Sequence, residues 1–220
     1  MKVLGVLGGT FDPVHYGHLG FANDALRALG LEQVCLGPAG RPPHRAPPVA
    51  SPEDRLAMTQ LGCAEFPGLA VDDREILREG PSYTVDTLQS MRDESPDLPL
   101  ALLLGADAVR GLAAWHQWKR LFALAHLVVA ERPGAPLEIA SLEPALREEW
   151  QRRCTDAPAL EHSLAGAIVR VPITPREISS TALRALVARG GARAVPPGLL
   201  PPQVLAYIDR NQLYRSPDAP

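Results

Sequence analysis

The chain has 220 residues, 46% of them hydrophobic and 21% charged, with a formal net charge of −3 at pH 7. This size and composition are sufficient for one α/β domain with a sizeable core. The small negative charge argues against a broad basic face for nucleic acid, although a local basic pocket is compatible with it. The chain contains no apolar segment long enough to span a bilayer, so we expect no membrane partner.

Short apolar runs alternate with helical patterns along the chain. Strands are predicted at residues 3–7, 34–38, 69–71, 100–104, 127–130 and 167–171. Helices are predicted near residues 17–29, 52–65, 84–94, 106–124 and 141–153. This alternation is typical of a parallel, doubly wound α/β sheet, which binds ligands beyond the carboxyl ends of its strands.

Two regions interrupt the alternation. Proline dominates residues 37–52, and because proline is excluded from helix interiors and central strands, we expect a long surface loop near the ligand; an inert linker is the alternative. Residues 179–214 are predicted to form two helices joined by a turn around residues 196–202. We expect a single domain over residues 1–220, with a small helical part at about 179–215.

The three cysteines, Cys35, Cys63 and Cys154, are widely spaced. An odd number without a C-x-x-C pair argues against a disulfide framework or a zinc site. We therefore expect three reduced thiols and a cytoplasmic protein without a signal segment.

The segment G-G-T-F-D-P-V-H-Y-G-H, residues 8–18, joins the first predicted strand to the first predicted helix. A glycine-rich turn at a helix N-terminus offers unpaired N–H groups and partial positive charge to a phosphate. His15 and His18 can reach one anion and donate hydrogen bonds to its oxygens. Gly17 has no Cβ, so the backbone and a ligand can approach closely. A metal-binding or structural histidine pair is the alternative, which the length of the motif disfavours.

The H-x-G-H sequence at residues 15–18 resembles the signature of the nucleotidylyltransferase superfamily. Further blocks resemble bacterial nicotinate-nucleotide adenylyltransferases in the right order, at residues 42–45, 81–88, 105–115, 178–184 and 207–214. The resemblance spans about residues 1–215. It implies a Rossmann-like nucleotidylyltransferase fold and transfer of AMP from ATP to nicotinate mononucleotide, which gives deamido-NAD and pyrophosphate.

The resemblance also implies residues for the ATP side. His15, His18 and Arg184 would be catalytic, and Asp107 would hold the adenosine ribose with Gly105. Ser180 and Thr181, at a helix start, would hold the β- and γ-phosphates together with Arg184. The remaining candidates for ATP binding are Gly8, Gly9, Thr10, Phe11, Gly17 and Arg45. From the residues alone, ordinary helix caps at Asp107 and at residues 179–181 remain alternatives.

On the acceptor side, the resemblance places the flat nicotinate ring against Trp115, with Tyr83 and Thr84 lining the same pocket. A core tryptophan is the alternative, and Trp118 is expected to be one. His44 belongs to the same set, at the family's P-P-H-K position. Arg45 stands there where the family has lysine, so we expect a phosphate contact with altered geometry or, alternatively, a solvated charge. Glu75 and Arg132 are further candidates for the pocket rim.

The expected cofactor is Mg²⁺, bound mainly through substrate phosphates and without a metal site built from protein side chains. The expected partners are ATP and nicotinate mononucleotide, while the formation of a homo-oligomer is left open by the sequence. Two other functions compete with this one. The acceptor could be nicotinamide mononucleotide, or the chain could be a nucleotide sensor without catalysis. A tRNA synthetase fragment is disfavoured because the chain has no K-M-S-K-S-like segment.

Overall fold

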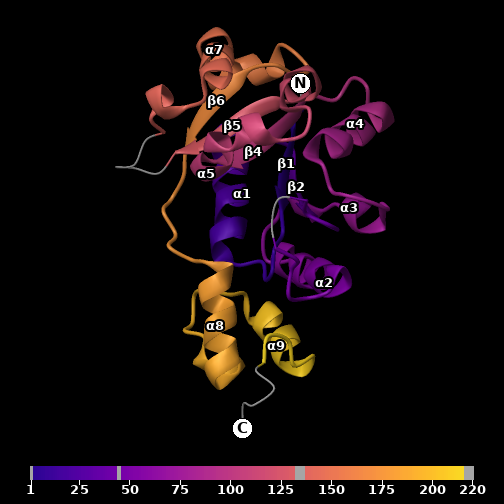
Figure 1. Cartoon of the computed structure of the whole chain (residues 1–220), viewed down its shortest axis with the longest axis vertical. Coiled ribbons are helices and arrows are strands. Elements are labelled where there is room, and N and C mark those ends of the chain that lie inside the picture. Colours follow the sequence, from indigo (N-terminus) through magenta and orange to yellow (C-terminus); the bar gives the residue numbers. More distant parts are fainter. Residues whose placement is uncertain (1, 44–45, 132–136, 216–220) are drawn as a thin grey trace.

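The computed structural model describes residues 2–43, 46–131 and 137–215. It has a parallel sheet between two layers of helices, with a pair of C-terminal helices at one end of the molecule (Figure 1). The sheet has six strands in the order β3-β2-β1-β4-β5-β6, and every pair is parallel. The strands are β1 Leu4–Gly9, β2 Gln33–Pro38, β3 Leu69–Val71, β4 Leu100–Gly105, β5 His126–Glu131 and β6 Ile168–Pro172. The predicted doubly wound fold is confirmed.

The order of the strands reverses between β1 and β4, which are neighbours in the sheet although two strands separate them in the sequence. In open α/β sheets, the crevice at such a switch point is where ligands bind. The two strands end at Gly9 and Gly105. The glycine-rich turn and the segment that begins at Gly105 therefore face each other across this crevice.

The helices are α1 Tyr16–Leu29, α2 Pro52–Cys63, α3 Arg74–Leu77, α4 Thr84–Glu94, α5 Ala106–Arg110, α6 Leu121–Leu124, α7 Pro144–Arg153, α8 Ser180–Gly190 and α9 Pro202–Arg210. Short 3-10 helices lie at Leu112–Ala114, Trp118–Arg120, Ile139–Ser141, Ala157–Glu161 and Ala192–Ala194. The sequence did not indicate α3, because four residues are too few to establish a helical period.

The prediction of one helix over residues 106–124 is wrong. The helix α5 stops at Arg110, where Gly111 follows, and glycine is a poor helix former. Trp115 is extended, and Gln117 has a φ of 49° in the left-handed region. The break has a consequence for the site, because it turns the side chain of Trp115 into a cavity at the carboxyl end of β4.

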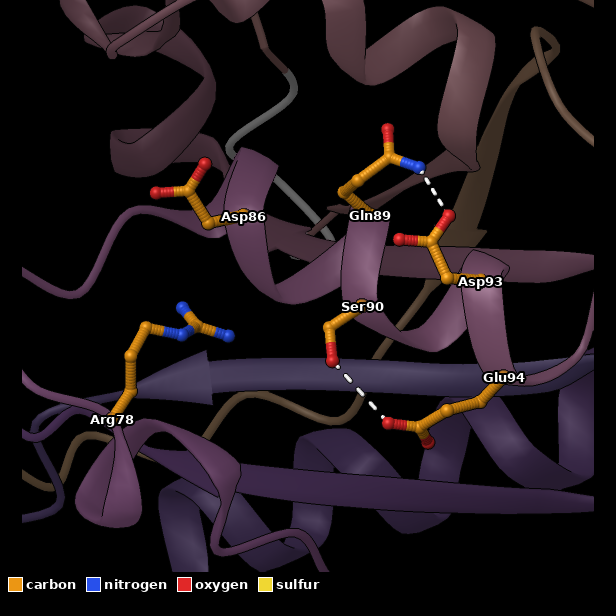
Figure 2. A pocket seen from close by; sticks show the side chains of 6 residues that line it. All are labelled: Arg78, Asp86, Gln89, Ser90, Asp93 and Glu94. Atoms are coloured by element: carbon orange, nitrogen blue, oxygen red, sulfur yellow. Dashed lines mark hydrogen bonds between the residues drawn. The ribbon is translucent and has the colours of Figure 1, made fainter.

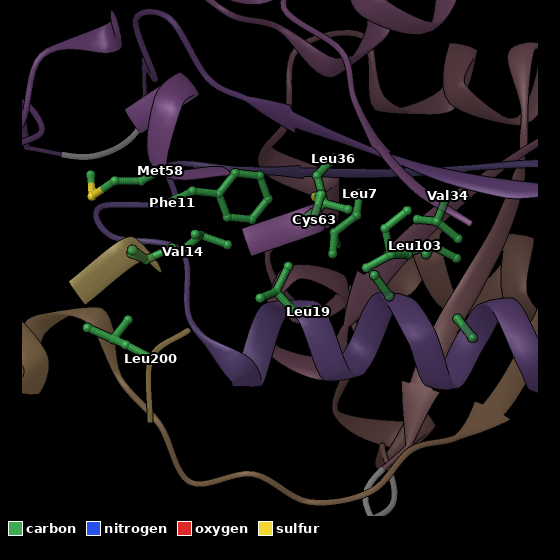
Figure 3. Close-up of a cluster of buried hydrophobic side chains, with 14 of the residues drawn as sticks. Leu7, Phe11, Val14, Leu19, Val34, Leu36, Met58, Cys63, Leu103 and Leu200 are labelled. Atoms are coloured by element: carbon green, nitrogen blue, oxygen red, sulfur yellow. The ribbon is translucent and has the colours of Figure 1, made fainter. Parts of the chain in front are cut away.

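Alternate residues of the central strands enter two hydrophobic clusters on opposite faces of the sheet. In β4, Ala101 and Leu103 belong to the first cluster, whereas Leu100, Leu102 and Leu104 belong to the second. Figure 3 shows part of the first cluster, in which Leu19 from α1 and Met58 from α2 approach the strands. Because both of its faces are covered, β4 has a continuous apolar sequence.

The C-terminal helices α8 and α9 are joined by a turn over residues 191–201, as the sequence predicted. They pack beside the carboxyl edge of the sheet, where α9 contacts α2 and Leu200 enters the first cluster. The Tyr16 N–H donates to the Leu199 carbonyl at 3.2 Å, which ties the turn to the start of α1. None of the helices in the described ranges has the length and apolar character needed to cross a membrane.

Candidate active site

Two cavities adjoin at the carboxyl edge of the sheet. The first, of about 540 Å³, is lined by His15 and His18 and by the start of α8; we call it the histidine cavity. The second, of about 300 Å³, is lined by Tyr83 and Trp115, and we call it the ring cavity. Asp107 lines both. The two groups of residues predicted for ATP and for the acceptor thus lie mostly in adjacent hollows.

His15 caps the first turn of α1 with its imidazole ring. Its Nδ1 accepts a hydrogen bond from the Gly17 N–H at 3.1 Å, so the neutral ring carries its proton on Nε2. Burial lowers the pKa of His15 to about 4, and the ring is therefore neutral near pH 7. Within residues 2–43, 46–131 and 137–215, no acceptor is paired with Nε2, which leaves this N–H for a ligand in the histidine cavity.

His18 lies one turn further along α1, and its ring is stacked on that of His15 with centroids 3.7 Å apart. Phe11 packs edge-on against His18 with a centroid distance of 5.0 Å. Phe11 is 2% exposed and lines neither cavity, so in this structure its ring supports His18, and its predicted contact with ATP remains a prediction. A Cβ on Gly9 would lie 2.6 Å from the Phe11 ring, which explains glycine at that position.

The other glycines of the motif serve different purposes. A Cβ on Gly17 would lie 2.8 Å from His15 Nδ1, so this glycine permits the hydrogen bond that fixes the histidine, in addition to lining the cavity. Gly8, Gly9 and Thr10 were predicted for ATP, but they line the ring cavity beside Tyr83. The turn therefore forms part of the wall of the ring cavity.

The start of α8 completes the histidine cavity, to which Ser180 and Thr181 contribute. The Ser180 hydroxyl donates to the Pro13 carbonyl at 3.0 Å, which joins α8 to the motif. Arg184 Nη1 donates to the Asp12 carbonyl at 2.7 Å, and Arg184 lines neither cavity. In this structure Arg184 holds the turn that precedes His15, and its predicted catalytic role remains a prediction.

Gly105 and Asp107 lie where the sequence placed them, at the carboxyl end of β4. Gly105 is the N-cap of α5, so Asp107 is not the capping residue that was considered as an alternative. The Asp107 side chain is 96% exposed and pairs with Arg110 at the junction of the two cavities. A carboxylate in this position can accept from the hydroxyl groups of a bound sugar.

The ring cavity gathers Tyr83, Thr84 and Trp115 from two different helical segments. The His116 ring lies 4.4 Å from that of Tyr83 and adds a third aromatic group, which the sequence analysis missed. Trp118 instead packs edge-on against Phe122 at 6.2 Å and is partly buried against the second cluster, so it is not fully inside the core as predicted.

Glu75 from α3 also lines the ring cavity, and it is 8% exposed. Its carboxylate accepts from the Thr87 hydroxyl at 2.6 Å. Burial raises the pKa of Glu75, an effect that the Thr87 hydrogen bond and the nearby Arg78 oppose. Glu75 thus lies at the pocket for which it was a candidate, although a lone acidic residue in the sequence does not indicate a specific role.

His44, Arg45 and Arg132 lie outside the described residues, and their predicted roles remain predictions. Pro42 and Pro43, which precede them, line the ring cavity. The described part of the chain contains no group of three or more His, Cys, Asp or Glu side chains able to hold a metal ion.

A separate surface hollow of about 480 Å³ contains none of the predicted residues. It is formed by Arg78 and one side of α4, and the side chains on α4 bond to one another (Figure 2). The Gln89 amide donates to Asp93 at 2.6 Å, and the Ser90 hydroxyl donates to Glu94 at 3.3 Å.

Comparisons with known proteins agree in both sequence and fold. The cytidylyltransferase-like family model matches residues 6–186. An Acidithiobacillus ferrooxidans protein named probable nicotinate-nucleotide adenylyltransferase is 47% identical over 213 residues, 96% of this chain and 95% of that protein. A protein of the same name from Aeromonas hydrophila is 48% identical, over 96% of this chain and 97% of that protein.

Among solved structures, the fold is similar to that of Plasmodium falciparum nicotinic acid mononucleotide adenylyltransferase complexed with NaAD. The TM-score is 0.71, and the match covers 97% of this chain and 98% of that chain. At 15% sequence identity, this likeness concerns the fold alone.

Proposed function

The chain belongs to the nicotinate-nucleotide adenylyltransferase family, and from this premise we propose that it transfers AMP from ATP to nicotinate mononucleotide. The products are deamido-NAD and pyrophosphate, and the reaction is a step of NAD synthesis. The observation that carries the proposal is the pair of adjoining cavities, one lined by histidines and the start of α8 and the other by aromatic rings, with Asp107 at their junction.

The histidine cavity is suited to the triphosphate of ATP. The neutral His15 ring offers its Nε2–H as a fixed hydrogen-bond donor, and His18 lies stacked beside it. The first turn of α8 adds unpaired backbone N–H groups and a partial positive charge. Donors held in place before the reaction stabilise the charge that develops on the α-phosphate, and this is the main means of catalysis available here.

The ring cavity is suited to the mononucleotide. Trp115 offers an indole face to the pyridine ring, and the first turn of α4, at Thr84, offers backbone N–H groups to its carboxylate. The 5′-phosphate of the mononucleotide attacks the α-phosphorus in line with the departing pyrophosphate. The attacking oxygen is already anionic, so the transfer requires neither a protein nucleophile nor a general base.

Nucleotidyltransferases generally use a divalent metal ion, and we propose Mg²⁺ for this chain. In the described residues no three-ligand cluster exists, so the protein would supply few direct ligands. Mg²⁺ prefers phosphate oxygens and retained waters, which fits binding through the substrates. The ion would neutralise charge on the β- and γ-phosphates, while the histidines act on the α-phosphate.

The test is a coupled assay that measures pyrophosphate release by the purified protein with ATP, Mg²⁺ and nicotinate mononucleotide. Turnover with this acceptor, and a higher kcat/KM than with nicotinamide mononucleotide, is the expected result. A preference for the amide would contradict the assignment of the acceptor. Binding of ATP without turnover on either compound would indicate the alternative, a nucleotide sensor.

Two expectations from the sequence remain proposals. We propose that the chain acts as a single domain, because Leu200 and Tyr214 of the C-terminal part belong to the same hydrophobic cluster as β1 and β2. We also propose a cytoplasmic location, based on three cysteines that are all free thiols.

A further inference from the structure

Beside the two cavities lies a pair of buried, oppositely charged side chains that the proposed reaction does not use. Arg55 of α2 is 0% exposed, and Asp12 of the glycine-rich motif is 4% exposed. Burying a charge is unfavourable unless hydrogen bonds replace its hydration. The partners of these two residues therefore indicate what the buried charges do.

Arg55 binds the beginning of the proline-rich loop. Its Nη1 donates to the Ala39 carbonyl at 2.6 Å and to the Thr10 carbonyl at 2.8 Å, and its Nη2 donates to the Gly40 carbonyl at 3.2 Å. Burial lowers the pKa of Arg55, and the charge of Asp12 opposes this effect. Arg55 thus joins the first two residues of the loop, Ala39 and Gly40, to Thr10 of the glycine-rich motif.

Asp12 binds the end of the same loop. Its carboxylate accepts from the N–H of Val49 at 2.8 Å and from that of Ala50 at 3.1 Å. It also accepts from the Tyr214 hydroxyl at 2.7 Å, near the end of the described chain. The cation holds carbonyls at one end of the loop, and the anion holds N–H groups at the other.

Between these anchors, Pro42 and Pro43 line the ring cavity, together with Ala39. We propose that Asp12 and Arg55 are positioning residues that fix both ends of the loop 39–50 to the glycine-rich motif. They thereby set the wall of the ring cavity relative to His15. The anchoring of the loop does not depend on the proposed function. Only its expected consequence, tight binding of the acceptor, rests on that function.

The first experiment compares Arg55→Met with a matched control, Arg92→Met. Arg92 also donates to several backbone carbonyls, those of Pro96, Leu98, Leu124 and Leu164, but it lies at the amino end of β4. Both variants are expected to lose thermal stability. Only Arg55→Met is expected to raise KM for the mononucleotide, by about tenfold or more, while KM for ATP changes by less than about twofold.

Two further variants keep the proposal testable if Arg55→Met fails to fold. Arg55→Lys retains the charge but has fewer donors, and it is expected to show an intermediate KM for the mononucleotide. Tyr214→Phe removes the hydroxyl that donates to Asp12. Among these variants, it is expected to cause the smallest rise in KM for the mononucleotide. An unchanged ratio of the two KM values in both variants would overturn the proposal.

A readout independent of turnover is hydrogen exchange of the loop amides. In Asp12→Asn, the N–H groups of Val49 and Ala50 are expected to exchange faster than in the wild-type protein, while those of β5 keep their rates. Unchanged exchange at both residues would contradict the role of Asp12. Wild-type turnover is measured first. If turnover is absent, the proposed function is contradicted, and the hydrogen-exchange result alone then tests whether Asp12 anchors the loop.

Discussion

His15 and His126 are two buried histidines at opposite ends of the sheet. His126 begins β5 at the amino end, where its Nδ1 accepts from the Ala167 N–H at 3.1 Å and its Nε2 donates to the Ser163 carbonyl at 2.9 Å. His15, at the carboxyl end, has the same tautomer, with Nδ1 bound by Gly17. Burial lowers the pKa of both rings. The two histidines differ in the partner of the Nε2–H group.

That difference separates a histidine whose donor is satisfied by the protein from one whose donor is left for a ligand. Both N–H groups are held in place by folding, but the donor of His126 is used by the protein itself, whereas that of His15 faces a cavity. The same contrast holds for the two ends of the sheet. At the amino end, His126 bonds only to the protein, whereas the carboxyl end combines such bonds, those of Asp12 and Arg55, with polar groups that line a cavity.

The largest expected effect comes from removing the imidazoles. His18→Ala should lower kcat by about 100-fold to 1,000-fold, since that is the usual result of deleting one donor to a transition-state oxyanion. His126→Gln is the control, which should lose stability but keep kcat within about twofold. Steady-state kinetics together with circular dichroism would measure both. A His18→Ala variant with nearly normal kcat would contradict the assignment.

The second prediction concerns pH and stability. The pKa of folded His15 is about 4, against 6.5 for the unfolded residue, so only the unfolded chain binds this proton between those values. The free energy of unfolding therefore falls as the pH falls through this range, by about 3 kcal/mol from this residue. Denaturant titrations at pH 7 and pH 4 should show a smaller loss for His15→Gln. An equal loss in both proteins would show that the buried ring does not titrate in this way.

A third, smaller effect distinguishes the two tryptophans. Trp115→Ala should raise KM for the mononucleotide by about 10-fold to 30-fold, in line with the energy of stacking on an aromatic side chain. Trp118→Ala removes a ring that packs on Phe122 and should lower Tm while KM is maintained. If the two substitutions had the same effect on KM, the pyridine ring would not stack on Trp115.

The smallest expected effect compares two exposed carboxylates. Asp107→Asn should raise KM for ATP by about tenfold, because the amide is a weaker acceptor for the ribose hydroxyls. Glu32→Gln, at the amino end, breaks only a surface pair with Lys2 and should change neither KM nor Tm appreciably. Calorimetric titration with a non-hydrolysable ATP analogue would measure the change without turnover. Equal affinities in the two variants would exclude a sugar contact by Asp107.

Much of the candidate site could be predicted because it follows local patterns. The motif at residues 8–18 joins β1 to α1, and Ser180 begins α8, both as expected. Where the sequence was insufficient, the cause was a short or broken helix or a contact between distant segments. The helix breaks after Arg110, and this break places Trp115 in the ring cavity. The hydrogen bonds of Asp12 and Arg55 to the loop 39–50 join residues that no sequence motif connects.

The sequence by itself determined the six strands in chain order, the turn at residues 8–18 and the family of the chain, because each rests on short contiguous motifs. Only the tertiary structure decided which buried histidine keeps a donor for a ligand, and that Gly8 and Gly9 line the ring cavity beside Tyr83. It also decided that both ends of one loop are held by buried charges. Burial and hydrogen-bond partners are set by segments up to about 200 residues apart, such as Asp12 and Tyr214, and no local pattern encodes them.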